Sequence, residues 1–333
     1  MDPIRRIIFK KNTKMKPIWL MRQAGRYLPE FRKIRSKNKD FIKLCLNQKL
    51  VPEITLQPLR RFNLDAAIIF SDILMLPYGL NQTVNFKKNY GPILGKINYQ
   101  DIFSIKKSSF LKKLKPVYKS MDKLSKRLKG KNKTLLGFVG APWTILIYMI
   151  NRSSPKRNII KEHFFLKNDH ELILDLIVKY LKIHIYNQVK NGATCIQIFD
   201  SWAGLVKKDK IGKFIYRPTA EIVKYTKSLN VPVICFPRNI SDYKIYSREV
   251  QPDCINIDYN VDPKSIIKQI DIPIQGGLDP KILLSNKDNL KKNTIKILNI
   301  FKDHPYIFNL GHGVLPQTNP NMVDYLVKLV KDF

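Results

Sequence analysis

The chain has 333 residues, 44% of them hydrophobic, and a formal net charge of +34 at pH 7. This length and composition allow a large buried core, and no apolar run reaches the roughly 20 residues that a membrane-spanning helix needs. The lysines are spread over nearly the whole sequence and accompany no helix-turn-helix, zinc-finger or RNP-type motif, so the charge alone does not indicate a nucleic-acid partner.

Short apolar runs rich in β-branched residues recur along the chain and predict strands. There are eight of them, at residues 17–21, 66–70, 135–139, 194–199, 232–236, 254–257, 272–275 and 306–310. Segments with helical periodicity lie between most of these runs, at residues 106–133, 169–189, 220–229, 288–302 and 319–329. Strands that alternate with helices indicate a parallel sheet, and eight such strands predict a (β/α)8 TIM barrel. We expect one domain over residues 1–333, with residues 1–15 as a short basic extension.

Polar and glycine residues follow the strands, at the end where barrel enzymes assemble their active sites. Turns between strand and helix need Asp, Ser and Gly as helix caps in any case, so a single turn of this kind would carry no weight. The turns here contain Arg22 to Arg26, Ser71-Asp72, Gly140-Ala141-Pro142-Trp143, Asp200-Ser201-Trp202, Pro237-Arg238, Asp258-Tyr259, Gly276-Gly277 and Gly311-His312-Gly313. Their convergence on one rim predicts a functional site there.

The first of these turns is rich in arginine, with Arg22 and Arg26 followed by Arg32 and Arg35. Arginine binds planar carboxylates or phosphates through two parallel hydrogen bonds, so this loop suits a ligand with several negative charges. A solvated basic loop is the alternative. Gly25 and Tyr27 lie among the arginines and favour a shaped backbone over a flexible arm.

The other rim residues each have a structural and a functional interpretation. Asp72 is as well placed to cap a helix as to accept N–H groups of a ligand or stabilise a transient cation. His312 lies between two glycines with no second histidine nearby, which argues against a metal site. Tyr148 falls on the helix after the third strand, where an aromatic side chain is usually core. Ser201 is not in a G-x-S-x-G motif, so we do not expect a serine nucleophile.

The cysteines Cys45, Cys195, Cys235 and Cys254 form no CxxC pair and no His-x-Cys motif. Three of them lie in predicted strands, which indicates buried thiols in a reducing compartment. The basic N-terminus has no apolar signal-peptide core. We therefore expect a cytoplasmic protein with no membrane contact.

The rim motifs resemble those of the uroporphyrinogen decarboxylase family. They run in family order along essentially the whole chain as MRQAGRYLPEFR at 21–32, FSDIL at 70–74, GAPWT at 140–144 with Tyr148-Met149, FDSWAG at 199–204 and NLGHG at 309–313. Three segments depart from the family pattern: residues 151–154 replace a frequent Glu-Gly-Gly, residues 237–239 replace a Lys-Gly pair, and Gly277 replaces a frequent Asn.

This resemblance implies a homodimeric barrel that uses no metal and no organic cofactor. It implies that the substrate is a tetrapyrrole, uroporphyrinogen III, whose four acetate side chains lose CO2 to give coproporphyrinogen III in haem biosynthesis. The substrate carboxylates would contact residues of the arginine loop, namely Arg22, Gln23, Ala24, Gly25, Arg26 and Arg35. Asp72 would accept the pyrrole N–H groups and stabilise a cationic intermediate, while Tyr148, Ser201 and His312 would line the cleft.

The chemistry of the residues agrees with this implication. A pyrrole acetate can lose CO2 when the adjacent ring carbon is protonated, and a fixed anion near the pyrrole nitrogens favours that cation. Arg22 is a candidate for delivering the proton. Two other functions stay open at this point. One is a zinc-dependent corrinoid or thiol methyltransferase of the same superfamily, and the other is a basic RNA-binding protein.

Overall fold

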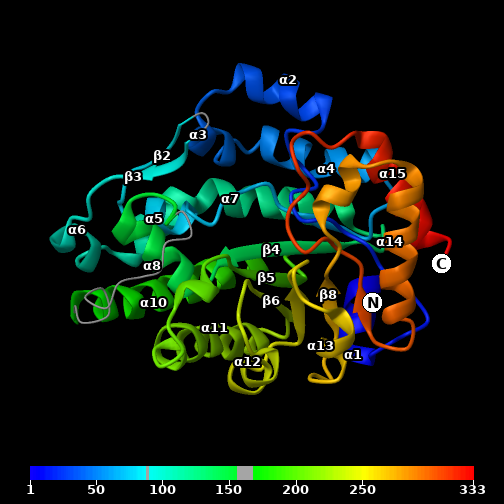
Figure 1. The fold of residues 1–333 in the computed structure, drawn as a ribbon. Helices are drawn as coiled ribbons and strands as arrows, with labels where there is room; N and C mark the ends of the chain where they lie inside the picture. Colours follow the sequence, from blue (N-terminus) through cyan, green and yellow to red (C-terminus); the bar gives the residue numbers. More distant parts are fainter. Residues whose placement is uncertain (88–89, 156–167) are drawn as a thin grey trace.

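The structure is a computed structural model that describes residues 1–87, 90–155 and 168–333. Its centre is a curled, all-parallel sheet of seven strands in the order β1-β4-β5-β6-β7-β8-β9. Figure 1 shows helices wrapped around this sheet. The strands are β1 (Ala66–Ile68), β4 (Thr134–Gly140), β5 (Cys195–Asp200), β6 (Val233–Pro237), β7 (Cys254–Ile257), β8 (Ile274–Gly276) and β9 (Tyr306–Ile307). These are seven of the eight predicted runs.

The remaining predicted strand, residues 17–21, lies between β9 and β1 and completes the TIM barrel, although it makes only an isolated parallel bridge from Ile18 to Phe308. On its other side, the Asp65 N–H donates to the Ile18 carbonyl over 2.8 Å. Side-chain oxygens accept two of the backbone N–H groups that would otherwise donate to a neighbouring strand. Ile18 donates to the Asp65 carboxylate (2.7 Å) and Met21 donates to the Asn309 side chain (2.9 Å). The segment therefore occupies the position of the eighth barrel strand without forming a regular strand.

Alternate residues of each strand face opposite sides, and the core divides accordingly. One set of side chains packs between the sheet and the helices, as Ala67 and Ile69 do around β1. The other set forms a second cluster that includes Ala66, Ile68 and Leu136, and it fills the barrel interior.

The predicted helices are confirmed, with ends shifted by a few residues. They correspond to α7 (Lys107–Leu128), α10 (Asn168–Lys190), α11 (Arg217–Ser228), α14 (Lys287–Ile300) and α15 (Pro320–Lys331). Further helices are α2 (Pro29–Lys37), α3 (Phe41–Cys45), α4 (Leu50–Arg61), α5 (Met75–Gly79), α6 (Tyr99–Phe103), α8 (Pro142–Asn151), α12 (Tyr243–Val250) and α13 (Pro263–Ile267). Helix α7 has its lysines outward and eight buried positions inward, as an amphipathic helix requires. No helix in the described ranges is long and apolar enough to span a membrane.

The N-terminal residues expected as a basic extension contain α1 (Pro3–Lys10). Ile4, Ile7 and Ile8 recur at helical spacing and are buried in the same cluster as the barrel interior. The Asp2 side chain accepts the Arg5 N–H at the start of the helix. This segment is therefore packed against the barrel instead of extending from it.

A hairpin that the sequence did not predict joins the barrel at the end of α8. Its strands, β2 (Val84–Lys87) and β3 (Gly91–Leu94), pair antiparallel, and Figure 1 shows them beside α5 and α8. The Leu94 N–H donates to the Arg152 carbonyl (2.7 Å), and Gln82 Nε2 donates to the Met149 carbonyl (3.0 Å). The departure at 151–154 thus lies where the hairpin holds the end of α8. Arg152 takes a left-handed backbone (φ 59°), the conformation that glycine adopts most readily.

Candidate functional site

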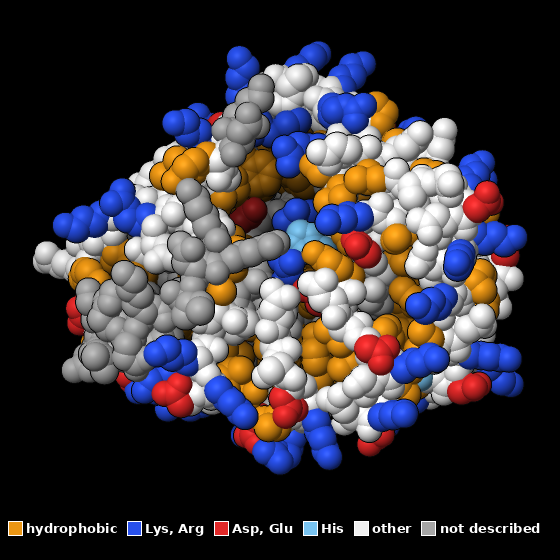
Figure 2. All heavy atoms as spheres, viewed as in Figure 1, with side chains coloured by type: hydrophobic (Ala, Val, Ile, Leu, Met, Phe, Trp, Pro, Cys, Tyr) orange, Lys and Arg blue, Asp and Glu red, His pale blue; other side chains and the backbone are white. Residues whose placement is uncertain are grey.

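The rim at the carboxyl ends of the strands carries the candidate site. Arg22 follows the segment 17–21, Asp72 follows β1, Tyr148 lies on α8 after β4, and Arg238 follows β6. Figure 2 shows a hollow in one face of the molecule, in which acidic, basic and histidine side chains lie close together. Lysines and arginines are otherwise spread around the outline of that face, as their distribution in the sequence predicts.

Arg22 is at the centre of the group. Its backbone is left-handed (φ 63°), an uncommon conformation for a residue with a side chain. Surrounding protein desolvates the guanidinium and lowers its pKa, while Asp72 and Tyr148 act in the opposite direction. The Arg22 side chain is nevertheless exposed to solvent. A Cβ placed on Gly313 would lie 2.3 Å from Arg22 Cδ, so the glycine of the Gly-His-Gly turn makes room for this side chain.

Asp72 combines the two interpretations that the sequence left open. Its carboxylate accepts the Leu74 N–H over 2.8 Å, and its carbonyl accepts the Met75 N–H over 3.1 Å, so it does open the turn into α5. Desolvation raises the pKa of Asp72 to about 6, against the opposing effects of the Leu74 N–H and the Arg22 charge. A desolvated carboxylate within electrostatic range of a guanidinium favours any further cation that comes near it.

Tyr148 faces the same charges from α8. Desolvation raises the pKa of its phenol, and both Asp72 and Arg22 lie within range of it. Its ring meets that of Trp202 edge-on, with centroids 6.2 Å apart. Ser201 precedes Trp202 and is partly buried, but no interaction between the described residues joins its side chain to Arg22 or Asp72.

Asp200 and Thr144 position these aromatic residues, and sequence reasoning did not single them out. The Thr144 hydroxyl donates to the Asp200 carboxylate (2.6 Å) and accepts the Trp202 N–H (3.2 Å). Asp200 is fully buried, and desolvation raises its pKa to about 7. The network ties α8, which carries Tyr148, to the loop that carries Ser201. Only the GAPWT and FDSWAG motifs pointed toward it.

Residues 23–25, in the middle of the arginine loop, make contacts that fix the shape of the loop backbone. Gln23 is fully buried, and its amide donates to the Ala66 carbonyl of β1 (3.0 Å) while its side-chain oxygen accepts the Leu20 N–H (3.1 Å). Ala24 and Gly25 are partly exposed. A Cβ on Gly25 would approach the Arg22 carbonyl to 2.9 Å. These contacts shape the loop that presents Arg22.

The two outer arginines differ in position. Arg26 is exposed, and its charge acts on Arg22. Arg35, near the end of α2, donates to the Asn38 carbonyl and lies over the Phe41 ring, 5.7 Å from its centroid. Arg35 and Asp72 both lie within electrostatic range of the buried Cys45 thiol.

Arg238 was noted in the sequence as part of the rim turn Pro237-Arg238 and as a departure from the family pattern. Its Nε donates to the buried Asp258 carboxylate over 2.9 Å, and its charge acts on Arg22. His312 is partly buried between Gly311 and Gly313. A Cβ on Gly311 would meet the Tyr259 nitrogen at 2.2 Å, so this turn is packed tightly against the residue that follows Asp258.

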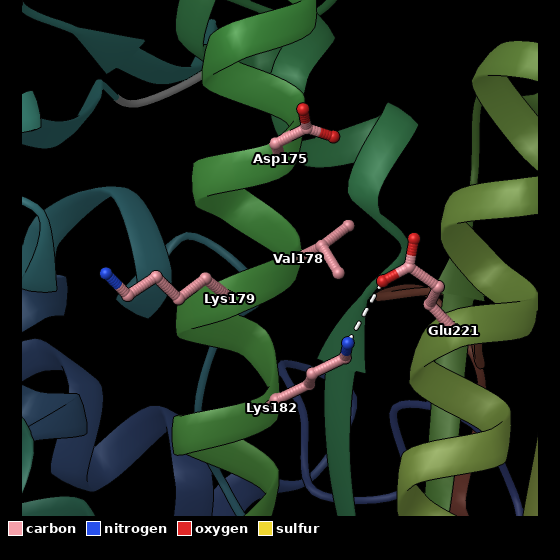
Figure 3. A pocket seen from close by; sticks show the side chains of 5 residues that line it. All are labelled: Asp175, Val178, Lys179, Lys182 and Glu221. Carbon is pink, nitrogen blue, oxygen red and sulfur yellow. Dashed lines mark hydrogen bonds and ion pairs between the residues drawn. The ribbon is translucent and has the colours of Figure 1, made fainter.

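A groove elsewhere on the surface is a weaker candidate for a functional site. A groove between α10 and α11 is lined by Asp175, Val178, Lys179, Lys182 and Glu221, and Figure 3 shows Lys182 paired with Glu221 across it (3.0 Å). Its charges compensate one another. Cys195, Cys235 and Cys254 are buried, as predicted, and so is Cys45; none of the four is in a disulfide. In the described part of the chain, no three His, Cys, Asp or Glu side chains gather as metal ligands.

Comparison with known proteins identifies the family. The family model of uroporphyrinogen decarboxylase (URO-D) matches residues 1–333. The uroporphyrinogen decarboxylase of Rickettsia bellii is 40% identical over 338 residues, which cover 100% of this chain and 98% of that protein. The enzyme of the same name from Orientia tsutsugamushi is 39% identical over 345 residues and covers 100% and 99%. The chain belongs to the uroporphyrinogen decarboxylase family.

Membership in this family agrees with the rim residues of the barrel. A solved methyltransferase from Methanosarcina mazei superposes with a TM-score of 0.80 at 17% identity, over 98% of this chain and 97% of that one. At this identity the likeness concerns the TIM-barrel fold alone. The methyltransferase alternative is therefore not favoured over the decarboxylase family, whose members match in sequence along the full length.

Proposed function

We propose that this chain catalyses the cofactor-independent decarboxylation of the four acetate side chains of uroporphyrinogen III, which yields coproporphyrinogen III and four CO2 in haem biosynthesis. The observation that carries the proposal is Asp72, a carboxylate with a raised pKa that lies within electrostatic range of Arg22 in a rim rich in guanidinium groups. Membership in the uroporphyrinogen decarboxylase family supports it independently.

The substrate suits this charge distribution. Uroporphyrinogen has eight carboxylates at its periphery and four pyrrole N–H groups at its centre. Arg22 and Arg26 offer donors to the carboxylates, and Arg35 extends the basic surface outward. Asp72 offers a single anion to the pyrrole nitrogens. Tyr148, Ser201 and His312 would line the cleft, while Gln23, Ala24 and Gly25 would shape the loop that holds Arg22.

The reaction needs a proton and an electron sink. A proton added to the ring carbon next to the one that bears the acetate arm makes the ring a cation, whose charge extends to nitrogen and to the carbon that bears the arm. The bond from the acetate CH2 to its carboxylate then breaks, its electron pair neutralises the ring, and CO2 leaves. A second proton converts the CH2 to a methyl group as the ring loses the proton it first gained. Asp72 would stabilise the cation throughout.

Arg22 is the proposed proton donor for the first step. Guanidinium groups rarely release a proton, because their ordinary pKa is above 12. Desolvation by the surrounding protein lowers the pKa of Arg22, which is the direction that donation requires. The same group is also suited to hold the carboxylate that leaves.

We further propose that residues 1–333 act as one domain, that the enzyme works as a homodimer in the cytoplasm, and that it needs no metal, no organic cofactor and no nucleic-acid partner. The family resemblance supports the dimer, and the four buried thiols suit a reducing compartment.

The decisive experiment is CO2 release from uroporphyrinogen III in the presence of a metal chelator, with the porphyrin products separated by carboxylate number. Formation of coproporphyrinogen at an undiminished rate with chelator supports the proposal. Activity that disappears with chelator and returns with zinc would point to the metal-dependent alternative. No turnover by well-folded protein under reducing, anaerobic conditions would overturn the proposal.

A further inference from the structure

The backbone of Arg238 is held within the rim. Arg238 is the first residue after β6, and its N–H donates to the Asp200 carbonyl over 3.0 Å. Its own carbonyl accepts the Gly204 N–H over 3.1 Å. Asp200 is the last residue of β5, and Gly204 lies in the loop after it, which carries Ser201 and Trp202. The position of Arg238 is therefore fixed relative to the proposed site.

The side chain of Arg238 is also fixed, from the other side. Its Nε donates to Asp258, whose side chain is fully buried, while that of Arg238 is 13% exposed. The second carboxylate oxygen of Asp258 accepts the Tyr259 N–H over 2.7 Å. Within the described ranges, the two terminal NH2 groups of Arg238 have no hydrogen-bond partner. A guanidinium anchored through Nε alone keeps most of its donors for a ligand.

The charge of Arg238 acts on the same group of residues as the arginine loop. Its positive charge repels that of Arg22 and lowers the Arg22 pKa, as the charge of Arg26 also does. Three guanidinium groups around one cleft repel one another unless an anion enters. Asp258 compensates the charge of Arg238 but binds only its Nε, so the carboxylate leaves the terminal NH2 groups able to bind an anion.

We propose that Arg238 is a further substrate-binding residue that holds a peripheral carboxylate of the tetrapyrrole on the β6 side of the cleft, with Asp258 fixing its guanidinium. This inference rests on the proposed function and deepens it. With Arg22 and Arg26 on one side and Arg238 on another, the macrocycle is held at separated points of its rim. Its rotation over Asp72 is thereby restricted. In the segment 237–239, which departs from the family pattern, Arg238 then supplies N–H donors for a substrate carboxylate where the family more often has lysine.

The rival explanation is that Arg238 serves only to neutralise Asp258. Three variants separate the two roles: Arg238→Lys, Arg238→Met, and Arg238→Met combined with Asp258→Asn, which removes the unpaired buried carboxylate. Arg248→Met is the matched control, since Arg248 is exposed on α12 and pairs with its neighbour Glu249. The measurements are KM and kcat for uroporphyrinogen III and the melting temperature of each variant.

We expect Arg238→Met to raise KM by about tenfold or more, the effect of losing a charged hydrogen bond, with a smaller change in kcat. Arg238→Lys should fall between Met and wild type, because lysine keeps the charge and loses the planar donor pair. The double variant should regain thermal stability and keep the high KM, while Arg248→Met should match wild type.

A double variant with wild-type KM would overturn the inference, because the role of Arg238 would then be structural. An unchanged KM in Arg238→Met would do the same. Both outcomes presuppose that the wild-type enzyme turns over uroporphyrinogen. A wild-type protein without that activity refutes the proposed function itself, so the two failures are distinguishable.

Discussion

Gly313 and Arg22 are separated by 290 residues in sequence and are in van der Waals contact, so that a Cβ on Gly313 would lie 2.3 Å from Arg22 Cδ and 2.6 Å from its Cγ. The glycine needs no unusual backbone here. It is needed because a larger residue would occupy the space of the guanidinium stem.

Gly313→Ala should therefore displace Arg22 while leaving the fold intact. We expect kcat/KM to fall by about 100-fold, since a shift of about 1 Å in a positioned group can cost that much. Gly212→Ala is the control, because a Cβ on Gly212 would meet no atom within 4 Å. A Gly313→Ala enzyme with wild-type kinetics would show that Arg22 tolerates displacement and does not act as proposed.

Asp72→Asn tests the anion at the centre of the proposed mechanism. We expect a correctly folded protein with kcat reduced by a factor of about 100 to 1000, the usual effect of removing one electrostatic stabiliser. In the wild type, kcat/KM should fall below about pH 6, as Asp72 gains a proton. The residual activity of the variant should lack this acid limb. Near-normal turnover by Asp72→Asn would rule out the assigned role.

Asp200 should make the stability of the protein depend on pH. Its folded-state pKa of about 7 is above the ordinary 3.8, so the folded state binds the proton more tightly than the unfolded state does. This contribution is fully favourable below about pH 4, declines as the pH rises to about 7, and is constant above that. Asp200→Asn should reduce the decline between pH 5 and pH 8, measured by urea unfolding, by on the order of 2 kcal/mol. Asp209→Asn, at an exposed position, should leave the slope unchanged.

Arg26→Ala should weaken substrate binding more than chemistry. Arg26 is exposed and reaches Arg22 only through its charge, so we expect KM to rise by about tenfold with kcat within about threefold of wild type. Arg127→Ala, an exposed position on α7, controls for the loss of one positive charge. An unchanged KM would remove Arg26 from the carboxylate-binding set.

Asp65→Ala should destabilise the closure of the barrel. The Asp65 carboxylate accepts the Ile18 N–H (2.7 Å) and pairs with Lys331 (2.5 Å), so it joins the segment 17–21 to the C-terminal helix α15. Removing it leaves a buried N–H without an acceptor, and we expect a loss of about 2–4 kcal/mol in the free energy of unfolding. Asp122→Ala breaks an exposed pair with Lys126 and should cost less than about 1 kcal/mol. Equal losses in the two variants would contradict the role of Asp65.

The sequence by itself determined the barrel and its polar rim. Strand residues alternate between two apolar environments, so the runs at 66–70 and 194–199 were recognisable from local pattern. The carboxyl ends of parallel strands share one edge, so Arg22, Asp72 and Asp200 had to lie on the same rim. The burial of α1 was also readable in principle from the spacing of Ile4, Ile7 and Ile8, but the flanking basic residues concealed it.

Only the tertiary structure decided which rim residues touch. Contacts such as Gly313 with Arg22, Thr144 with Asp200 and Arg238 with Asp258 depend on the register of the closed sheet and on side-chain direction, which no local pattern specifies. The raised pKa values of Asp72 and Asp200 likewise arise from desolvation, which depends on how the folded chain packs around them. Residue type and order fixed the chemistry available at the rim, whereas packing selected the charges that face the cleft.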